Sequence, residues 1–172
     1  WGVAINPSGT FAYVTNLSSG TVSKIDLASD TVVATIAVGT NPYGVAINSA
    51  GTFAYVANSG SNTVSKINLA TDTVVATIPV GGWPIGVDID PAGTYAYVAN
   101  ASSTFISKIN LSTDIVVATI PVGDYTAGLK INATGTFAYA SKPLSDTVSK
   151  IKLATNTVVA TFTVGNYPIG VT

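Results

Sequence analysis

The chain repeats itself every 42 residues, with no insertion or deletion over four copies. The segment Gly2-Val3-Ala4-Ile5-Asn6 returns at the same phase as Gly44-Val45-Ala46-Ile47-Asn48, Gly86-Val87-Asp88-Ile89-Asp90 and Gly128-Leu129-Lys130-Ile131-Asn132. A fixed period in the range of 20–50 residues indicates a stack of identical structural units, in which each unit buries its apolar surface against the next. Any fold for this chain must therefore place four equivalent units side by side.

One repeat, residues 43–84, predicts four short β-strands. Its β-branched and aromatic residues fall in four segments, separated by Gly, Asn, Asp and Ser, and no window shows a helical apolar period. Asn6-Pro7-Ser8-Gly9 and Asp90-Pro91-Ala92-Gly93 fit type I turns between the first two segments. The predicted strands cover 44–47, 53–58, 63–69 and 73–80.

Both faces of these strands carry apolar residues, which suits a sheet covered by a neighbour on each side. We therefore predict an all-β fold, a β-propeller built from four-stranded antiparallel blades. The predicted blades are 1–42, 43–84, 85–126 and 127–168, with 169–172 as the start of a further innermost strand.

A motif within the repeat resembles a known family. Tyr13-Val14-Thr15-Asn16 recurs as Tyr55-Val56-Ala57-Asn58 and Tyr97-Val98-Ala99-Asn100, whereas the fourth copy reads Tyr139-Ala140-Ser141-Lys142. With the preceding Gly-Val-Ala-Ile-Asn segment, this pattern resembles the YVTN family of β-propeller repeats over the whole chain. The resemblance implies a secreted, periplasmic or cell-surface protein of bacteria or archaea, including the surface-layer type, and implies no single activity.

Four blades in an open fan would leave two blade faces uncovered. Each face measures roughly 300 Å² if four strands lie ~4.8 Å apart. At ~25 cal/mol/Å², burial of one such face would contribute at most about 8 kcal/mol to stability. We expect these faces to be covered by further blades of a longer chain, by a second copy in a homodimeric ring, or by copies in a filament. A closed ring of four blades stays open as an alternative, and family relatives usually close at about seven.

Composition narrows the chemistry. The chain has no His, Cys, Met, Glu, Gln or Arg, and its net charge is −1. It therefore lacks the ligands of most zinc, copper and haem sites, the usual partner of a nucleophilic serine, and a basic surface for nucleic acid. We expect no enzyme, no bound cofactor or metal, no nucleic-acid partner and no membrane insertion, since apolar runs stay far below ~20 residues.

Two places vary most between copies: the loop between the second and third strands and the connection from each blade to the next. Both are expected at the same end of the ring, which predicts a recognition surface there. Trp83, Tyr125 and Tyr167 share one phase of this connection with Asn41, and Asp124 precedes Tyr125. We predict an aromatic arc around the mouth of a central channel, suited to a glycan or a protein partner. The alternative is that each ring packs under its own loop.

Charged residues also follow the period. Asp88 and Lys130 replace alanines of the innermost strand and predict an ion pair or weak cation site on the channel wall, or a merely solvated wall. The row Lys24, Lys66, Lys108 and Lys150 is expected to keep its ammonium groups in water, with a binding stripe as the alternative. The row Asp30, Asp72, Asp114 and Asn156 is expected to occupy left-handed turns. Asn-X-Ser/Thr acceptors for glycosylation occur at Asn16, Asn100, Asn110 and Asn132.

These observations favour a non-catalytic extracellular or cell-surface propeller, acting as a structural or protein-interaction module of a surface layer, matrix or filament. One alternative is a secreted or periplasmic propeller that binds a carbohydrate or other small ligand. A second is a segment of a propeller enzyme whose catalytic groups lie outside this chain.

Overall fold

The computed structural model describes residues 2–171 and confirms the all-β prediction. Within that range the chain forms four antiparallel four-stranded sheets and no helix. The first sheet contains β1 (Val3–Ile5), β2 (Phe11–Asn16), β3 (Thr21–Asp26) and β4 (Thr31–Ala37). The second contains β5 (Pro42–Ile47), β6 (Phe53–Asn58), β7 (Thr63–Asn68) and β8 (Thr73–Pro79). The third contains β9 (Pro84–Ile89), β10 (Tyr95–Asn100), β11 (Phe105–Asn110) and β12 (Ile115–Pro121), and the fourth contains β13 (Leu129–Ile131), β14 (Phe137–Lys142), β15 (Thr147–Lys152) and β16 (Thr157–Thr163).

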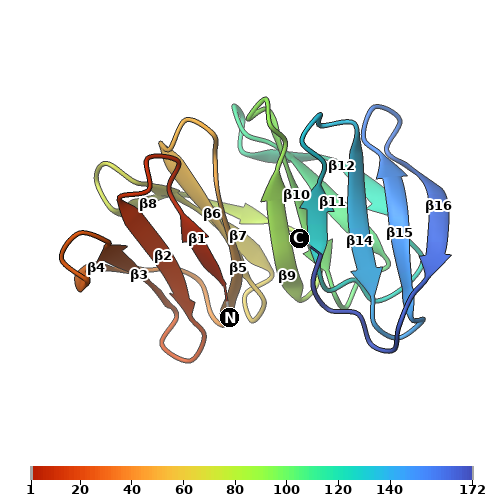
Figure 1. Cartoon of the computed structure of the whole chain (residues 1–172), viewed down its shortest axis with the longest axis horizontal. Helices are drawn as coiled ribbons and strands as arrows, with labels where there is room; N and C mark the ends of the chain where they lie inside the picture. The colour runs from red at the N-terminus through yellow and green to blue at the C-terminus, as the bar shows by residue number, and fades with distance from the viewer. Residues whose placement is uncertain (1, 172) are drawn as a thin grey trace.

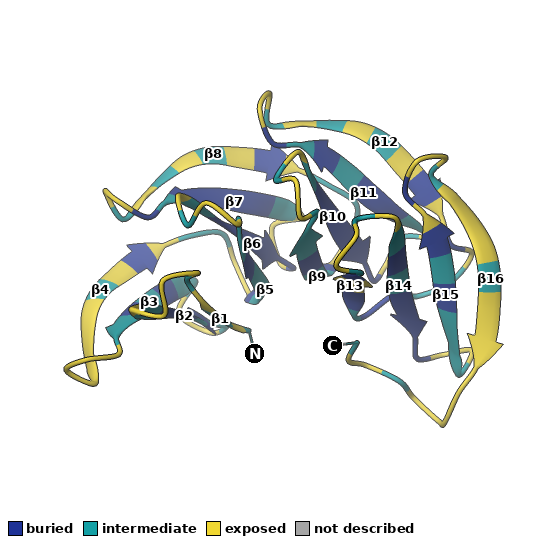
Figure 2. Cartoon of the chain, turned by 45° about the horizontal axis from the view of Figure 1, so that its top comes forward, coloured by how far each residue is buried: buried dark blue, intermediate teal, exposed yellow. Residues whose placement is uncertain are grey.

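Each sheet is an up-and-down meander in which neighbours in sequence are neighbours in space (Figure 1). The four sheets stand side by side as blades and form an arch, with both chain ends on its inner side (Figure 2). The first strand of each blade lies innermost, and the fourth strand forms the outer rim. The part of the chain that the structure describes contains no helix long and apolar enough to cross a bilayer.

The predicted turns form as the sequence indicates. Between β5 and β6, the Gly51 amide donates to the Asn48 carbonyl at 2.9 Å, and the Asn48 Oδ1 accepts bonds from the amides of Thr52 and Phe53. Between β7 and β8, Asp72 adopts a left-handed φ of 55°, as Asp and Asn tolerate better than other residues. Turn chemistry within the repeat therefore fixes the register of each blade.

The inner strands approach so closely that they require glycine. A Cβ atom on Gly44 would lie 2.5 Å from the carbonyl oxygen of Ile85 in the next blade. The repeated Gly at the start of each inner strand is thus explained by the narrow end of the wedge, where two backbones meet.

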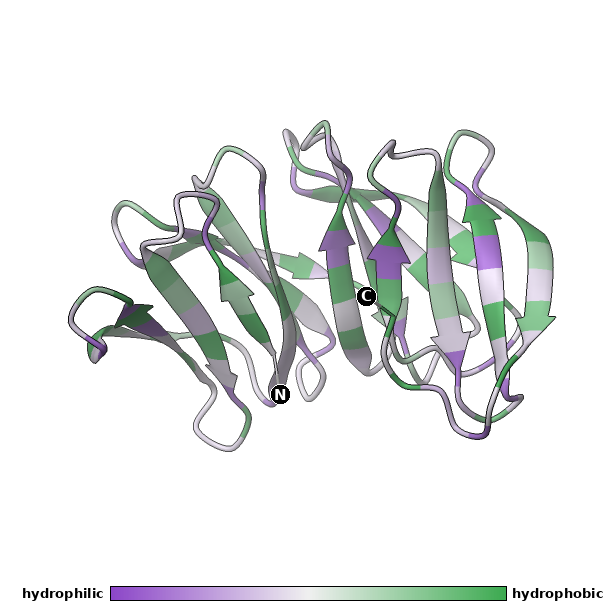
Figure 3. Ribbon diagram, in the orientation of Figure 1, coloured by the Kyte–Doolittle hydropathy of each residue, from purple (hydrophilic) through white to green (hydrophobic). Residues whose placement is uncertain are grey.

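Large side chains fill the wider part of each seam. Between the second and third blades, Tyr55, Val64 and Ile78 pack against Val98, Ile109 and Leu111. The other two seams repeat this arrangement, and apolar residues predominate along the strands that line them (Figure 3). Each blade is therefore stabilised mainly by its neighbours, as in other repeat proteins.

The outer strand of each blade carries a β-bulge. In the second blade Lys66 pairs with Ala76 and Ile67 pairs with Val74, which leaves Val75 between them, 52% exposed. Bulges twist an edge strand away from regular pairing and so protect the rim against addition of another strand.

Candidate binding site

The connections between blades lie at the same end of the arch as the loops between second and third strands. The Ser59 amide donates to the Asn41 carbonyl at 2.9 Å, and the Ala101 amide donates to the Trp83 carbonyl at 2.8 Å. The first two connections are therefore anchored to the loop of the following blade.

Trp83 and Tyr167 occupy left-handed backbone on this surface. Their φ angles are 51° and 54°, a conformation in which a bulky residue is an outlier. Side chains from the preceding loops hold them there. The Trp83 amide donates to Asn62 Oδ1 at 2.8 Å, and the Tyr167 amide donates to Asp146 Oδ1 at 2.8 Å.

Asn41 stands at the same phase and has the same conformation, with a φ of 51°. Asparagine adopts left-handed backbone more readily than Trp or Tyr, so Asn at all of these positions would give a more stable fold. Trp83 and Tyr167 are 46% and 59% exposed, so both are partly accessible at this end of the molecule.

Tyr125 completes the predicted row with a different local structure. Its amide donates to Asp124 Oδ1 at 2.7 Å, and the left-handed residue of this connection is Gly123. The Tyr125 ring meets Trp83 edge to face, with ring centroids 6.5 Å apart. Burial raises the pKa of Tyr125, and the phenols of Tyr167 and Tyr43 raise it further. The structure thus brings neighbouring aromatic side chains of the row together.

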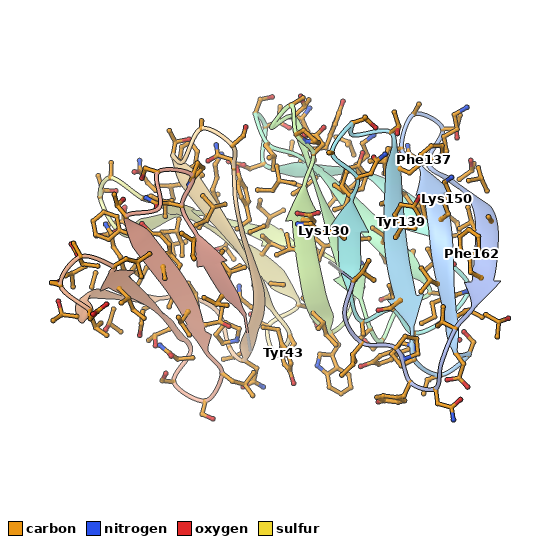
Figure 4. All side chains as sticks on the ribbon, viewed as in Figure 1. Tyr43, Lys130, Phe137, Tyr139, Lys150 and Phe162 are labelled. Carbon is orange, nitrogen blue, oxygen red and sulfur yellow. The ribbon has the colours of Figure 1, made fainter. Side chains whose placement is uncertain are left out.

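Tyr43 joins this end of the molecule and was not singled out by the sequence (Figure 4). It helps to line a shallow hollow of about 270 Å³ between the first two connections. That volume is below the usual range for drug-sized ligands and suits a single small group. The sequence feature that could have identified Tyr43 is its position directly after Pro42, at the start of the innermost strand of the second blade. The hollow is lined by Leu17, Asn41, Tyr43, Ser59, Gly60 and Trp83.

The prediction that the lysine row keeps its ammonium groups in water is wrong for Lys24 and Lys66. Lys24 and Lys66 are only 9% and 8% exposed, so their ammonium groups do not extend into water. Lys24 Nζ lies 2.9 Å from Asp72 Oδ1, and Lys66 Nζ lies 2.8 Å from Asp114 Oδ1. Each lysine also donates to a carbonyl of the next blade, Leu69 or Leu111. The lysine and aspartate rows therefore lock adjacent blades together.

An aromatic ring lies beneath each ammonium group. Lys66 Nζ is 4.6 Å from the centroid of Phe53, and Lys108 Nζ is 4.1 Å from that of Tyr95. At the third seam the acceptor is the amide of Asn156, whose Oδ1 lies 3.3 Å from Lys108 Nζ. Burial lowers the pKa of Lys108, and the charge of Asp90 opposes this effect in part.

Asp88 and Lys130 lie on neighbouring inner strands, β9 and β13. Lys130 Nζ is 3.4 Å from Asp88 Oδ1, and the Ile131 amide donates to Asp88 Oδ2 at 2.8 Å. The Lys130 side chain is 50% exposed and that of Asp88 is 14% exposed. Among residues 2–171 no three His, Cys, Asp or Glu side chains gather to hold a metal ion.

The glycosylation acceptors differ in access. Asn100 is completely buried and its amide donates to Phe105 O and Ser107 Oγ, so it cannot carry a glycan in the folded chain. Asn16 donates in the same way to Ser23 Oγ. Asn110 ends β11 and Asn132 follows β13. Both are half-buried and accept bonds from backbone amides of the turns that follow them.

Solved structures show the same arrangement of blades. No model of a known family matches this sequence, and no curated protein matches it. A chain of hydrazine synthase from Kuenenia stuttgartiensis is similar at 28% identity and a TM-score of 0.89, over 93% of this chain and 47% of that one. A functionally unknown protein from Desulfotomaculum acetoxidans is similar at 19% identity and a TM-score of 0.82, over 98% of this chain and 56% of that one.

A third similar structure is the Cps50 (Swd1) β-propeller domain of Myceliophteria thermophila, at 15% identity and a TM-score of 0.84. The match covers 99% of this chain and 59% of that domain. The chain therefore spans about half the length of the propellers it matches, and by its fold it is a set of four β-propeller blades.

Proposed function

We propose that this chain is a non-catalytic recognition module of the secreted, YVTN-repeat type, which binds its ligand through the loop end that carries Trp83, Tyr125 and Tyr167. The observation behind the proposal is the left-handed backbone at Trp83 and Tyr167. Strained backbone persists where the surrounding structure enforces it, and such strain clusters at functional sites. Asn41 is the residue that the backbone alone would favour at this phase.

The chemistry of the surface favours a neutral, hydroxyl-rich ligand. Trp83 and Tyr125 provide aromatic faces and edges, while Asn41 and Ser59 provide polar groups beside them. Exposed rings with a polar rim suit the apolar faces of sugars. We propose an oligosaccharide of a cell surface or matrix as the ligand.

The test is calorimetric titration of the chain with neutral oligosaccharides such as cellohexaose, mannohexaose and chitohexaose. Binding of one of them should weaken at least about tenfold in Trp83→Asn, since aromatic contacts of this kind dominate recognition surfaces. Asn is chosen because it occupies the equivalent position 41 with the same φ, so the loop should keep its shape.

A matched control is Ile115→Thr on β12. Ile115 is an exposed apolar residue like Trp83, but it begins β12 and so lies at the opposite end of that strand from the connection to the next blade. Threonine stands at its phase in the other three copies, so the fold accepts the change. Binding that is equally weakened in both variants, or unchanged in Trp83→Asn, would contradict the proposal.

A second candidate is a supporting propeller within an enzyme assembly. The observation in its favour is the 28% identity to a chain of hydrazine synthase, a higher identity than that of the other two structures. In that role the protein purified from its native source would migrate with a catalytic subunit in fixed ratio. Recovery without such a subunit would remove this candidate.

A further inference from the structure

The uncovered faces of the first and last blades carry the two complementary sides of the seam that joins neighbouring blades within the chain. At each seam one blade supplies a lysine and the next blade supplies an acceptor 48 residues further along: Lys24 to Asp72, Lys66 to Asp114, Lys108 to Asn156. Lys150 occupies the same phase in the last blade, and Asp30 occupies the acceptor phase in the first. No ion pair found among residues 2–171 includes either of them.

The last blade presents a complete donor face. Lys150 Nζ lies 4.0 Å from the centroid of Phe137, as its equivalents lie over Phe11, Phe53 and Tyr95. Phe137, Tyr139, Lys150 and Phe162 are shown on β14, β15 and β16 in Figure 4. Phe162 is 47% exposed, whereas Ile36, Ile78 and Ile120 at its phase are 3%, 2% and 0% exposed.

The first blade presents the complementary acceptor face. Leu27 is 38% exposed, but its equivalents Leu69, Leu111 and Leu153 are 7%, 8% and 4% exposed because a preceding blade covers them. Asp30 has a φ of 55°, the same as Asp72, so its backbone is already set as in the seams that hold an ion pair. At the inner end of the last blade, Ile169 of the same chain already takes the place of the next innermost strand, where its carbonyl accepts a bond from Ser141 Oγ at 3.2 Å. Residues 169–171 must therefore move aside when another first blade docks, and over the rest of the area each face lacks only the other to form a seam.

We propose that the face of the last blade docks on the face of the first blade of a second copy, with Lys150 of one copy paired to Asp30 of the other. Two copies can make this contact twice about a two-fold axis and close into a ring. The arch with both chain ends on its inner side fits such closure (Figure 2).

The area of contact favours a closed pair over an open series. One seam between copies buries about 600 Å² in total if each face has roughly 300 Å², which is the size of a non-specific contact. Two seams bury about 1,200 Å², which reaches the lower end of specific, stable interfaces. Closure also removes both uncovered faces at once.

The experiment measures the mass of the 172-residue chain in solution by sedimentation and light scattering over a dilution series. A particle of twice 17.4 kDa is expected. Lys150→Asp and Asp30→Lys each place like charges at both seams and should weaken association at least about 100-fold. Lys152→Asp is the control, because it makes the same charge change at a position that does not contribute to a seam. Asp26 and Asn68, which stand at the equivalent position in the first two blades, bond only to their own turns.

Mixing the two charge-reversed variants gives the sharpest result. In a mixed pair each seam again joins one acidic and one basic side chain at these two positions, so association should return. Restored pairing on mixing supports the proposal. A ladder of larger species, or pairing that ignores both reversals, overturns it. A monomer at all concentrations also overturns it and leaves the faces to blades of another sequence.

Discussion

Lys66 and Asp114 lie 48 residues apart in the sequence, and their Nζ and Oδ1 atoms are 2.8 Å apart across the seam between the second and third blades. The Lys66 ammonium group lies over the ring of Phe53 and donates to the Leu111 carbonyl at the turn of the next blade. The wide end of each wedge is thus closed by a charge-assisted contact, while glycine allows close approach at the narrow end.

We expect Lys66→Met to lower the free energy of unfolding by about 1–2 kcal/mol, as measured by urea denaturation. The substitution keeps the apolar stem and removes bonds to Asp114 and the Leu111 carbonyl. The Asp114 side chain is 26% exposed and regains water, which limits the loss. The exposed Lys152 is the control, and Lys152→Met should change stability by less than about 0.5 kcal/mol. Equal effects of the two would contradict this account.

Asn156→Asp should complete the third ion pair. The φ of 54° at Asn156 matches that of Asp72, so the backbone accepts the change. We expect a gain of about 0.5–1 kcal/mol at low salt and less at high salt, because the new pair is partly exposed to solvent. The pKa of Lys108, now lowered by burial, should rise. The gain should vanish in a Lys108→Met background, and a gain that persists there would assign it to another cause.

Alkaline pH should destabilise the fold. Burial raises the pKa of Tyr13 to about 12, with a further contribution from Asp72, and burial also raises the pKa of Tyr55 and Tyr97. From about pH 10 to 12 the unfolded chain loses these protons while the folded chain keeps them, so stability falls as pH rises through this window. Phenolate absorbance of the folded chain should show that these tyrosines titrate well above pH 10. A single transition of all tyrosines near pH 10 would contradict this prediction.

Trp83→Asn should leave a more stable protein than Trp83→Ala, by about 1 kcal/mol in chemical denaturation. Both variants lose the ring contact with Tyr125, so the difference isolates the left-handed backbone at position 83. The same pair of substitutions at Tyr125, whose φ is not positive, should show no such difference. A difference of equal size at both positions would refute the role of the backbone.

Gly44→Ala should destabilise the chain by about 3 kcal/mol or more, since the added Cβ would lie 2.5 Å from the Ile85 carbonyl oxygen and would separate two inner strands. Gly165→Ala is the matched control, because nothing lies within 4 Å of the position its Cβ would take and its φ is not positive. Thermal unfolding of the two variants measures the contrast. Similar behaviour of both would show that the inner strands can move apart.

The sequence was sufficient for the features that act within one repeat. Strand segments, the Asn48 turn and the left-handed Asp72 follow from local chemistry, which is the same in every copy. Contacts between repeats were harder to predict, because Lys66 reaches a residue at a different phase of the next copy. The Trp83 loop was recognised by its aromatic residue, but its φ depends on Asn62, which stands 21 positions earlier.

The bond from Lys66 to Asp114 has a consequence for how such chains change length. Lys24 and Lys66 each pair with the residue 48 positions further on, so the contact does not depend on how many blades the protein contains. Duplication or deletion of 42 residues in the gene would therefore preserve every junction, and ring size can drift over evolutionary time without any unit having to adapt.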